Sequence, residues 1–311
     1  MLFLMQTLTH LLVLALVVST MLGVGLMLTV RDIYVSLHDR RWLVRALLAN
    51  FVVLPAIALG VSRLLELDPV LAAALLVLAT APGGPVLVKW AMLAKGDPAL
   101  AVGLLVTLLL VGVTAQPLVL PILLDGVTVS AGAIVRTLIF TVLAPLLFGL
   151  ALRARRPLRA AWLQVPLRWV SNASMVLVVT LLPGVHWREL SELSGTGALS
   201  AAVLFVVLSA TAGWVIGGPE AGPRRILALC CGQPNMAAAF VIATQNFSDS
   251  RVMLMLLILM IASLPIVAAD VLLFPAASDS SCVRIWRSRW RGAAPTLAVR
   301  VPIGLSRQQG S

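Results

Sequence analysis

The sequence predicts an all-α integral membrane protein of about nine transmembrane helices, and three observations predict this class. Of the 311 residues, 60% are apolar and only 11% are charged, about half the charged fraction of soluble domains. Apolar residues in that number would fill roughly nine spans of about 20 residues each. The charges are also clustered, so that residues 1–30, 98–124 and 226–248 carry none. A cytosolic enzyme, a nucleic-acid-binding module and a disordered chain are excluded.

The apolar segments follow one another with short polar connections. We place the spans at residues 8–30, 43–62, 69–91, 98–123, 130–152, 167–184, 196–217, 224–246 and 250–274. With Lys89 set aside as intramembrane, the loops and tail on one side carry 18 basic residues and those on the other side carry four. Because basic loops stay in the cytoplasm, the bias predicts an external N-terminus and a cytoplasmic C-terminus. Residues 1–277 form the transmembrane domain, and residues 278–311 form a basic cytoplasmic tail.

Two spans contain residues that do not fit a helix. The third reads Ala81-Pro82-Gly83-Gly84-Pro85, and the eighth reads Cys230-Cys231-Gly232-Gln233-Pro234-Asn235. Proline removes a backbone donor, and glycine permits conformations that helices do not use. The predicted breaks in the two helices are formed by Pro82, Gly83, Gly84, Gly232 and Pro234. At membrane depth, non-helical backbone is tolerated only where it is buried in protein or lines a water-filled cavity, so these breaks indicate a binding site. A plain proline kink in either span is the alternative.

The positions of the broken spans add a prediction about topology. The third and eighth spans lie five apart, so they cross the bilayer in opposite directions. Paired broken helices of opposite direction are typical of inverted-repeat secondary transporters, in which they cross at the midplane. Four spans in one repeat and five in the other are unequal, so we expect one further helix to be missing before the first span.

Three segments resemble one family of membrane transporters. Pro82-Gly83-Gly84, followed by residues 93–100 and 117–124, resembles the fourth and fifth helices of the bile acid:sodium symporter family. Gly232, Asn235 and the alanines that follow resemble its Glu-x-Gly-x-Gln-Asn segment, and residues 23–29 resemble its Gly-x-Gly-Leu stretch. The similarity covers residues 8–275 and is of the bacterial type, which implies a bacterial inner membrane. It also implies ten helices in two inverted repeats, and it implies that this chain begins at the second of these ten helices.

The resemblance implies sodium ligands at positions where this chain lacks suitable side chains. The family's ligand positions here hold Leu87, Val88, Ala101, Leu105, Cys230 and Pro234, while Asn50 replaces a glutamine. Sodium is a hard cation that prefers several oxygen ligands, and these side chains offer almost none. We therefore predict no cofactor and no metal site. Sodium coupling stays an alternative that the residues support poorly.

The candidate binding residues are Asn50, Lys89, Gln233 and Asn235. Lys89 could pair with an organic anion, because intramembrane ionisable residues are functional candidates. The alternative is that Lys89 extends its ammonium group to the lipid headgroups. Asp270 in the last span is a conceivable partner for Lys89.

These patterns favour a secondary transporter that moves an organic anion or amphipathic acid by alternating access. One alternative is a non-transporting scaffold or sensor of the same fold. Another is a sodium-independent exporter of a weak acid or metalloid, with Cys230 or Cys231 as a soft ligand. No GxSxG, HExxH or paired intramembrane aspartate motif occurs, so we expect no enzyme. The expected partners are a small organic anion and the lipid bilayer, without nucleic acid, in an undetermined oligomeric state.

Overall fold

The structure is a computed structural model. It describes residues 2–28, 40–84, 86–93, 98–124, 131–193 and 195–273. The first half of the chain contains α1 (Leu2–Met27), α3 (Arg40–Leu48), η1 (Ala49–Val53), α4 (Leu54–Leu64), α5 (Pro69–Ala79), α6 (Val86–Leu93), α7 (Pro98–Leu123), α8 (Ala131–Leu138), η2 (Ile139–Leu143) and α9 (Ala144–Arg155). The second half contains α10 (Pro157–Val185), α11 (Trp187–Glu192), α12 (Ala198–Ile216), α13 (Ala221–Gly232), α14 (Met236–Asn246) and α15 (Ser250–Leu273). The predicted tail, residues 278–311, lies outside the described residues.

The described part of the chain is helical without strands, and each predicted span overlaps one helical element or two or three consecutive ones. Within the described ranges, six helical segments are long and apolar enough to cross a membrane. This confirms an all-α integral membrane protein. Some helices begin before the predicted spans: α1 begins at Leu2, whereas the first span was placed at residues 8–30, and α10 begins at Pro157, whereas the sixth span was placed at residues 167–184. The apolar pattern misses this start because Arg159 and Arg168 interrupt it, although an interfacial turn of helix tolerates arginine.

Two long helices contain a π-helical turn that the sequence pattern does not predict. η1 joins α3 to α4 and ends two residues before Pro55, while η2 joins α8 to α9 and ends two residues before Pro145. Proline cannot donate to the preceding turn and clashes with its carbonyl, and a wider turn relieves that clash. Single π-helical turns of this kind are frequent at functional sites.

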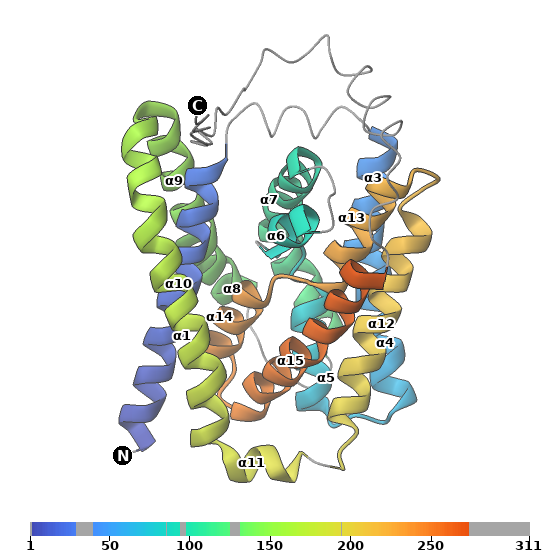
Figure 1. The fold of residues 1–311 in the computed structure, drawn as a ribbon. Coiled ribbons are helices and arrows are strands. Elements are labelled where there is room, and N and C mark those ends of the chain that lie inside the picture. Colours follow the sequence, from blue (N-terminus) through green and yellow to red (C-terminus); the bar gives the residue numbers. More distant parts are fainter. Residues whose placement is uncertain are drawn as a thin grey trace, which may run out of the picture. The chain divides into compact units, whose positions relative to one another are not determined.

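The helices form three neighbouring groups (Figure 1). α1, α9 and α10 pack together on one side, and α12 packs against α13 and α4 on the other. α5, α6, α7, α14 and α15 lie between these groups, while α13 of the second broken pair belongs to the α12 group. α1 and α9 approach backbone to backbone: a Cβ on Gly25 would collide with the carbonyl oxygen of Leu146, and one on Gly149 would lie 2.5 Å from the carbonyl oxygen of Leu22. Only glycine permits that approach.

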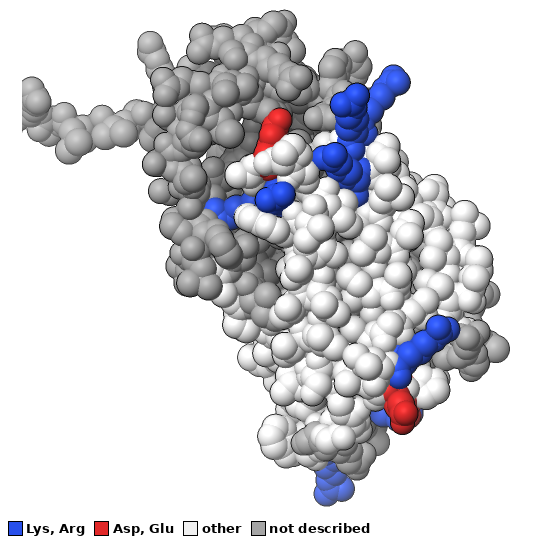
Figure 2. All heavy atoms as spheres, turned by 90° about the vertical axis from the view of Figure 1, so that its right-hand side faces the viewer, with Lys and Arg blue, Asp and Glu red and all other residues white. Residues whose placement is uncertain are grey.

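Charged side chains lie mainly at the ends of the helices. Figure 2 shows an uncharged band between charges at the upper and lower ends of the face formed by the right-hand helices of Figure 1. Such a band is expected where lipid tails cover the surface, because charges in hydrocarbon are costly.

Candidate functional site

The first break separates α5 from α6. α5 ends at Ala79, and the hydroxyl of Thr80 donates to the Leu76 carbonyl oxygen over 2.8 Å. Residues 81–84 are not helical, and Gly83 has a φ of 76°, in the region that favours glycine. Pro82 packs against α7, where a Cβ on Gly112 would lie 3.2 Å from the proline ring. The predicted break at Pro82, Gly83 and Gly84 is confirmed.

The second break is shorter than the sequence suggested. α13 continues through Cys230 and Cys231 to Gly232, so Gly232 is helical and the prediction that this glycine belongs to the break was wrong. A glycine at the end of a helix is compatible with helical geometry. The chain leaves the helix at Gln233 and Pro234. It re-enters at Asn235, whose side-chain oxygen accepts a hydrogen bond of 3.1 Å from the Ala238 N–H as the N-cap of α14.

The two breaks touch each other. The backbone N–H of Asn235 donates to the carbonyl oxygen of Ala81 over 2.7 Å. A Cβ on Gly84 would lie 2.8 Å from the carbonyl oxygen of Pro234 and 3.0 Å from that of Gln233. The broken helices therefore cross with their main chains in contact, as predicted. The crossing satisfies backbone groups that hydrocarbon would leave unpaired.

Polar side chains from neighbouring helices support both breaks. The side-chain amide of Gln233 donates to the Ser263 hydroxyl on α15 over 2.7 Å, and both side chains are buried. On the other break, the amide of Gln116 on α7 donates to the Val77 carbonyl oxygen over 3.2 Å and lies 3.3 Å from the Thr80 hydroxyl. These contacts fix the breaks to α15 and α7.

Asn50 lies in η1 and faces α13. Its amide donates to the Ala46 carbonyl oxygen over 2.9 Å, and its side-chain oxygen lies 3.9 Å from the sulfur of Cys230. Both side chains are fully buried. The contact brings together two positions 180 residues apart in the sequence, one of them the position where the resemblance places a carboxylate. A thiol is a weak donor and supplies no negative charge while protonated.

The predicted binding residues divide into three sets. Gln233 and Asn235 lie at the crossing, whereas Asn50 contacts α13 two residues before that helix ends. Lys89 lies on α6 and Asp270 on α15, but their side chains are outside the described residues. The pairing of Lys89 with Asp270 therefore stays a prediction.

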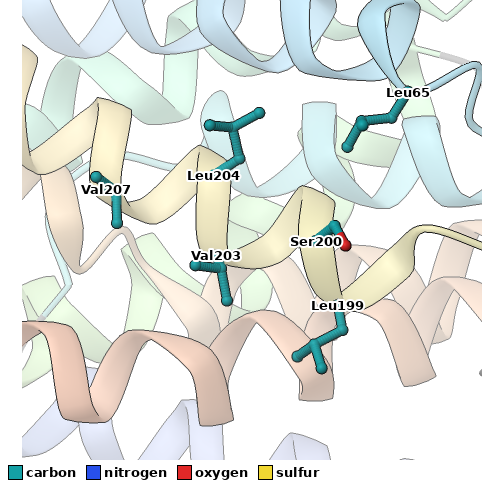
Figure 3. Close-up of a pocket in the computed structure, with 6 residues that line it drawn as sticks. All are labelled: Leu65, Leu199, Ser200, Val203, Leu204 and Val207. Atoms are coloured by element: carbon teal, nitrogen blue, oxygen red, sulfur yellow. The ribbon is translucent and has the colours of Figure 1, made fainter.

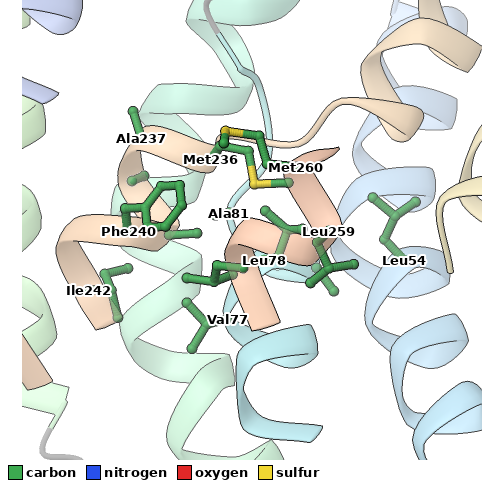
Figure 4. Close-up of a cluster of buried hydrophobic side chains, with 14 of the residues drawn as sticks. Leu54, Val77, Leu78, Ala81, Met236, Ala237, Phe240, Ile242, Leu259 and Met260 are labelled. Carbon is green, nitrogen blue, oxygen red and sulfur yellow. The ribbon is translucent and has the colours of Figure 1, made fainter. Parts of the chain in front are cut away.

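Apolar side chains fill the sodium-ligand positions that the resemblance implies. Leu87, Val88, Ala101 and Leu105 are all buried in the core. Ala81 belongs to the cluster of buried apolar side chains in Figure 4, which also includes Leu54 of α4, Met236 of α14 and Met260 of α15. Packing of this kind protects the exposed backbone of a broken helix from lipid. It does not supply the oxygen ligands that sodium needs.

Two hollows lie away from the crossing. A cavity of about 260 Å³ separates the start of α1 and the end of α10 from the segment between α14 and α15, and its lining includes His10, His186, Thr244 and Asp249. Among the described residues no cluster of three potential metal ligands occurs. A shallower hollow of about 610 Å³ follows α12 and is aliphatic except for Ser200 (Figure 3).

An all-α membrane domain in which two broken helices meet at mid-span belongs to the architectural class of secondary transporters. The family model described as "Sodium Bile acid symporter family" matches residues 13–187, and the chain belongs to this family. It is therefore a member of a transporter family.

Two relatives were identified. The chain is 25% identical over 234 residues to "Probable sodium/metabolite cotransporter BASS1, chloroplastic" of Arabidopsis thaliana, an alignment that covers 74% of this chain and 58% of that protein. It is also 25% identical over 239 residues to "Uncharacterized sodium-dependent transporter YocS" of Bacillus subtilis (strain 168), covering 73% of this chain and 72% of that protein. The chain thus spans less than two thirds of the length of the plant relative.

The structure adds supporting residues that the sequence patterns did not reveal. These are Thr80 at the end of α5, Gln116 on α7 and Ser263 on α15, buried polar residues in largely apolar surroundings. Polar residues inside membrane helices are a general signal for interhelical hydrogen bonds. That signal could have found them, but not the partners they contact.

Proposed function

We propose that this chain is a secondary transporter that moves an organic anion or amphipathic acid across a bacterial inner membrane by alternating access. The main observation in support is the hydrogen bond between the Asn235 N–H and the Ala81 carbonyl oxygen, which joins two broken helices. Paired broken helices of this kind surround the solute in secondary transporters. The relationship to a sodium/metabolite cotransporter and a sodium-dependent transporter supports a small solute.

We propose that the anion binds beside the crossing, where Asn50 and Asn235 supply polar groups and Lys89 supplies positive charge. Sodium coupling of the family's kind is disfavoured by the chemistry of this chain. Cys230 occupies the carboxylate position, and its thiol faces the side-chain oxygen of Asn50. The cationic side chain on α6 would then take the electrostatic role of the ion. The proposed orientation is an external N-terminus and a cytoplasmic C-terminus, from the excess of basic residues on one side.

The test is uptake by the purified full-length protein in proteoliposomes. Radiolabelled taurocholate and small carboxylates such as acetate are supplied with a sodium gradient or an equal potassium gradient. We expect saturable uptake of an acid at the same rate in both gradients, and a loss of at least tenfold in a Lys89→Ala variant. Arg63→Ala, which removes an exposed arginine at the end of α4, is the matched control and should transport normally. Uptake only with sodium would refute sodium independence, and no uptake of any acid would favour a scaffold.

A further inference from the structure

Two arginines from distant parts of the sequence meet at the basic end of the helices. Arg45 lies on α3, and Arg224 lies on the first turn of α13. Both reach Gly218, in the turn between α12 and α13. A Cβ built on Gly218 would collide with a terminal nitrogen of Arg45, and the Nε of Arg224 donates to the Gly218 carbonyl oxygen over 2.8 Å. The side chains of Arg45 and Arg224 thus both lie against Gly218.

No carboxylate neutralises this pair within the described ranges. Glu220 is the acidic residue nearest to Arg224 along the chain, but it is exposed and forms no ion pair there with either arginine. Because like charges at close range repel each other, the cluster favours an anion between them.

Arg224 lies beside a tryptophan near the end of an apolar helix, an arrangement typical of the lipid headgroup region. The guanidinium carbon of Arg224 lies 5.4 Å from the ring centre of Trp214, near the end of α12. Arg45 lies in the second turn of α3, so about 7 Å of helix separates it from the first residue. Tryptophan and arginine near the ends of transmembrane helices are typical of the membrane interface. Anionic lipids concentrate in the leaflet that faces the basic loops.

We propose that Arg45 and Arg224, with the Gly218 turn between them, bind a phosphate group, and that its source is the headgroup of an anionic phospholipid. Guanidinium groups recognise phosphate oxygens through paired hydrogen bonds. Gly218 has a φ of 97°, so glycine suits this turn and leaves room for the Arg45 side chain. The site bridges α3 to the α12–α13 hairpin, which leads into the second break. This inference does not depend on the identity of the transported solute.

Native mass spectrometry of the full-length protein in detergent tests the proposal. Phosphatidylglycerol and phosphatidylcholine are added at equal concentration, and bound lipid is counted. We expect the wild type to retain phosphatidylglycerol preferentially. Arg45→Gln and Arg224→Gln should each lower its apparent affinity about fivefold, the effect of one basic residue at an anionic membrane surface. Arg63→Gln, an exposed arginine at the opposite end of the same long helix, should bind like the wild type.

A conservative variant, a competition with inorganic phosphate and a double variant distinguish the possible outcomes. Arg45→Lys keeps the charge but loses the paired donors, so it should fall between the wild type and Arg45→Gln. Inorganic phosphate should not compete at millimolar concentration if the lipid is the source, and full competition would overturn that assignment. Equal retention of phosphatidylglycerol by the wild type and the Arg45→Gln/Arg224→Gln double variant would overturn the site. The exposed position of Arg45 makes the single variant informative even if the double variant folds poorly.

Discussion

Replacing Gly84 by alanine places a methyl group between the two broken helices. The new Cβ would lie 2.8 Å from the Pro234 carbonyl oxygen, whereas ordinary contacts begin at 3.4 Å, so the main chains must separate by about 0.6 Å. The Asn235 N–H to Ala81 hydrogen bond, now 2.7 Å, would then approach about 3.3 Å. Overpacking costs about 1–3 kcal/mol, and a buried hydrogen bond contributes about 0.5–1.5 kcal/mol. After the entropic benefit of removing a glycine, about 0.4–1 kcal/mol, we expect a net loss of about 2 kcal/mol.

The assay is equilibrium unfolding of the purified protein in mixed micelles, with the free energy of unfolding compared between variants. Gly60→Ala is the matched control, because a Cβ at this exposed position of α4 has no neighbour within 4 Å. The control should be neutral or slightly more stable than the wild type. If Gly84→Ala unfolds within about 0.5 kcal/mol of Gly60→Ala, the main chains are not in contact at the crossing and the reasoning is refuted.

Three further predictions follow from described contacts. Gln233→Leu should lower the free energy of unfolding by about 0.5–1.5 kcal/mol, because the buried Ser263 hydroxyl loses the hydrogen bond from Gln233 and keeps only its own bond to the Met260 carbonyl oxygen. Adding Ser263→Ala should cost less than the sum of the single changes, and strict additivity in the double-mutant cycle would contradict the contact. Gly25→Ala should destabilise the protein by about 1–3 kcal/mol in the same assay, whereas Gly23→Ala, which meets open space, should not; equal midpoints would exclude the close approach of α1 and α9. The hydrogen bond from the Arg251 side chain lowers the pKa of Asp249, so the contribution of Asp249 to stability is present above about pH 4 and is lost as the pH falls through the lowered pKa. The Asp249→Asn variant should therefore show a flatter dependence of the free energy of unfolding on pH over that acidic range. An unchanged pH profile would argue against the interaction.

The sequence predicted the helical class and the two breaks because both depend on local chemistry. Long apolar segments require helices in a membrane, and Pro82, Gly83, Gly84 and Pro234 interrupt them wherever they fold. The position of α10 was predicted less well, because arginines near its start look like a loop in a hydropathy pattern. The π-helical turns before Pro55 and Pro145 were missed because a proline alone does not specify how the helix accommodates it.

The candidate site was predicted only in part, because its contacts join helices that are distant in the sequence. Gln233 and Asn235 follow from their place beside a break, but their contacts with Ser263 and Ala81 depend on how distant helices pack. The same applies to the contact of Asn50 with Cys230, which joins α13 to η1. Such contacts depend on tertiary packing that periodicity and composition do not encode. The roles of Asn50, Lys89, Gln233 and Asn235 in binding stay predictions.

The junction of the two broken helices has a consequence for how this family can diverge. Its hydrogen bond joins the main-chain N–H of Asn235 to the main-chain oxygen of Ala81, so neither side chain forms it. Evolution can therefore exchange most side chains around the junction without removing it, as long as the glycine at position 84 keeps the two main chains close. Inserting or deleting one residue in either segment would shift the register and remove the bond. Ligand side chains can be exchanged in such a scaffold while its architecture persists, so the number of residues in each break constrains the fold more strictly than their side chains do.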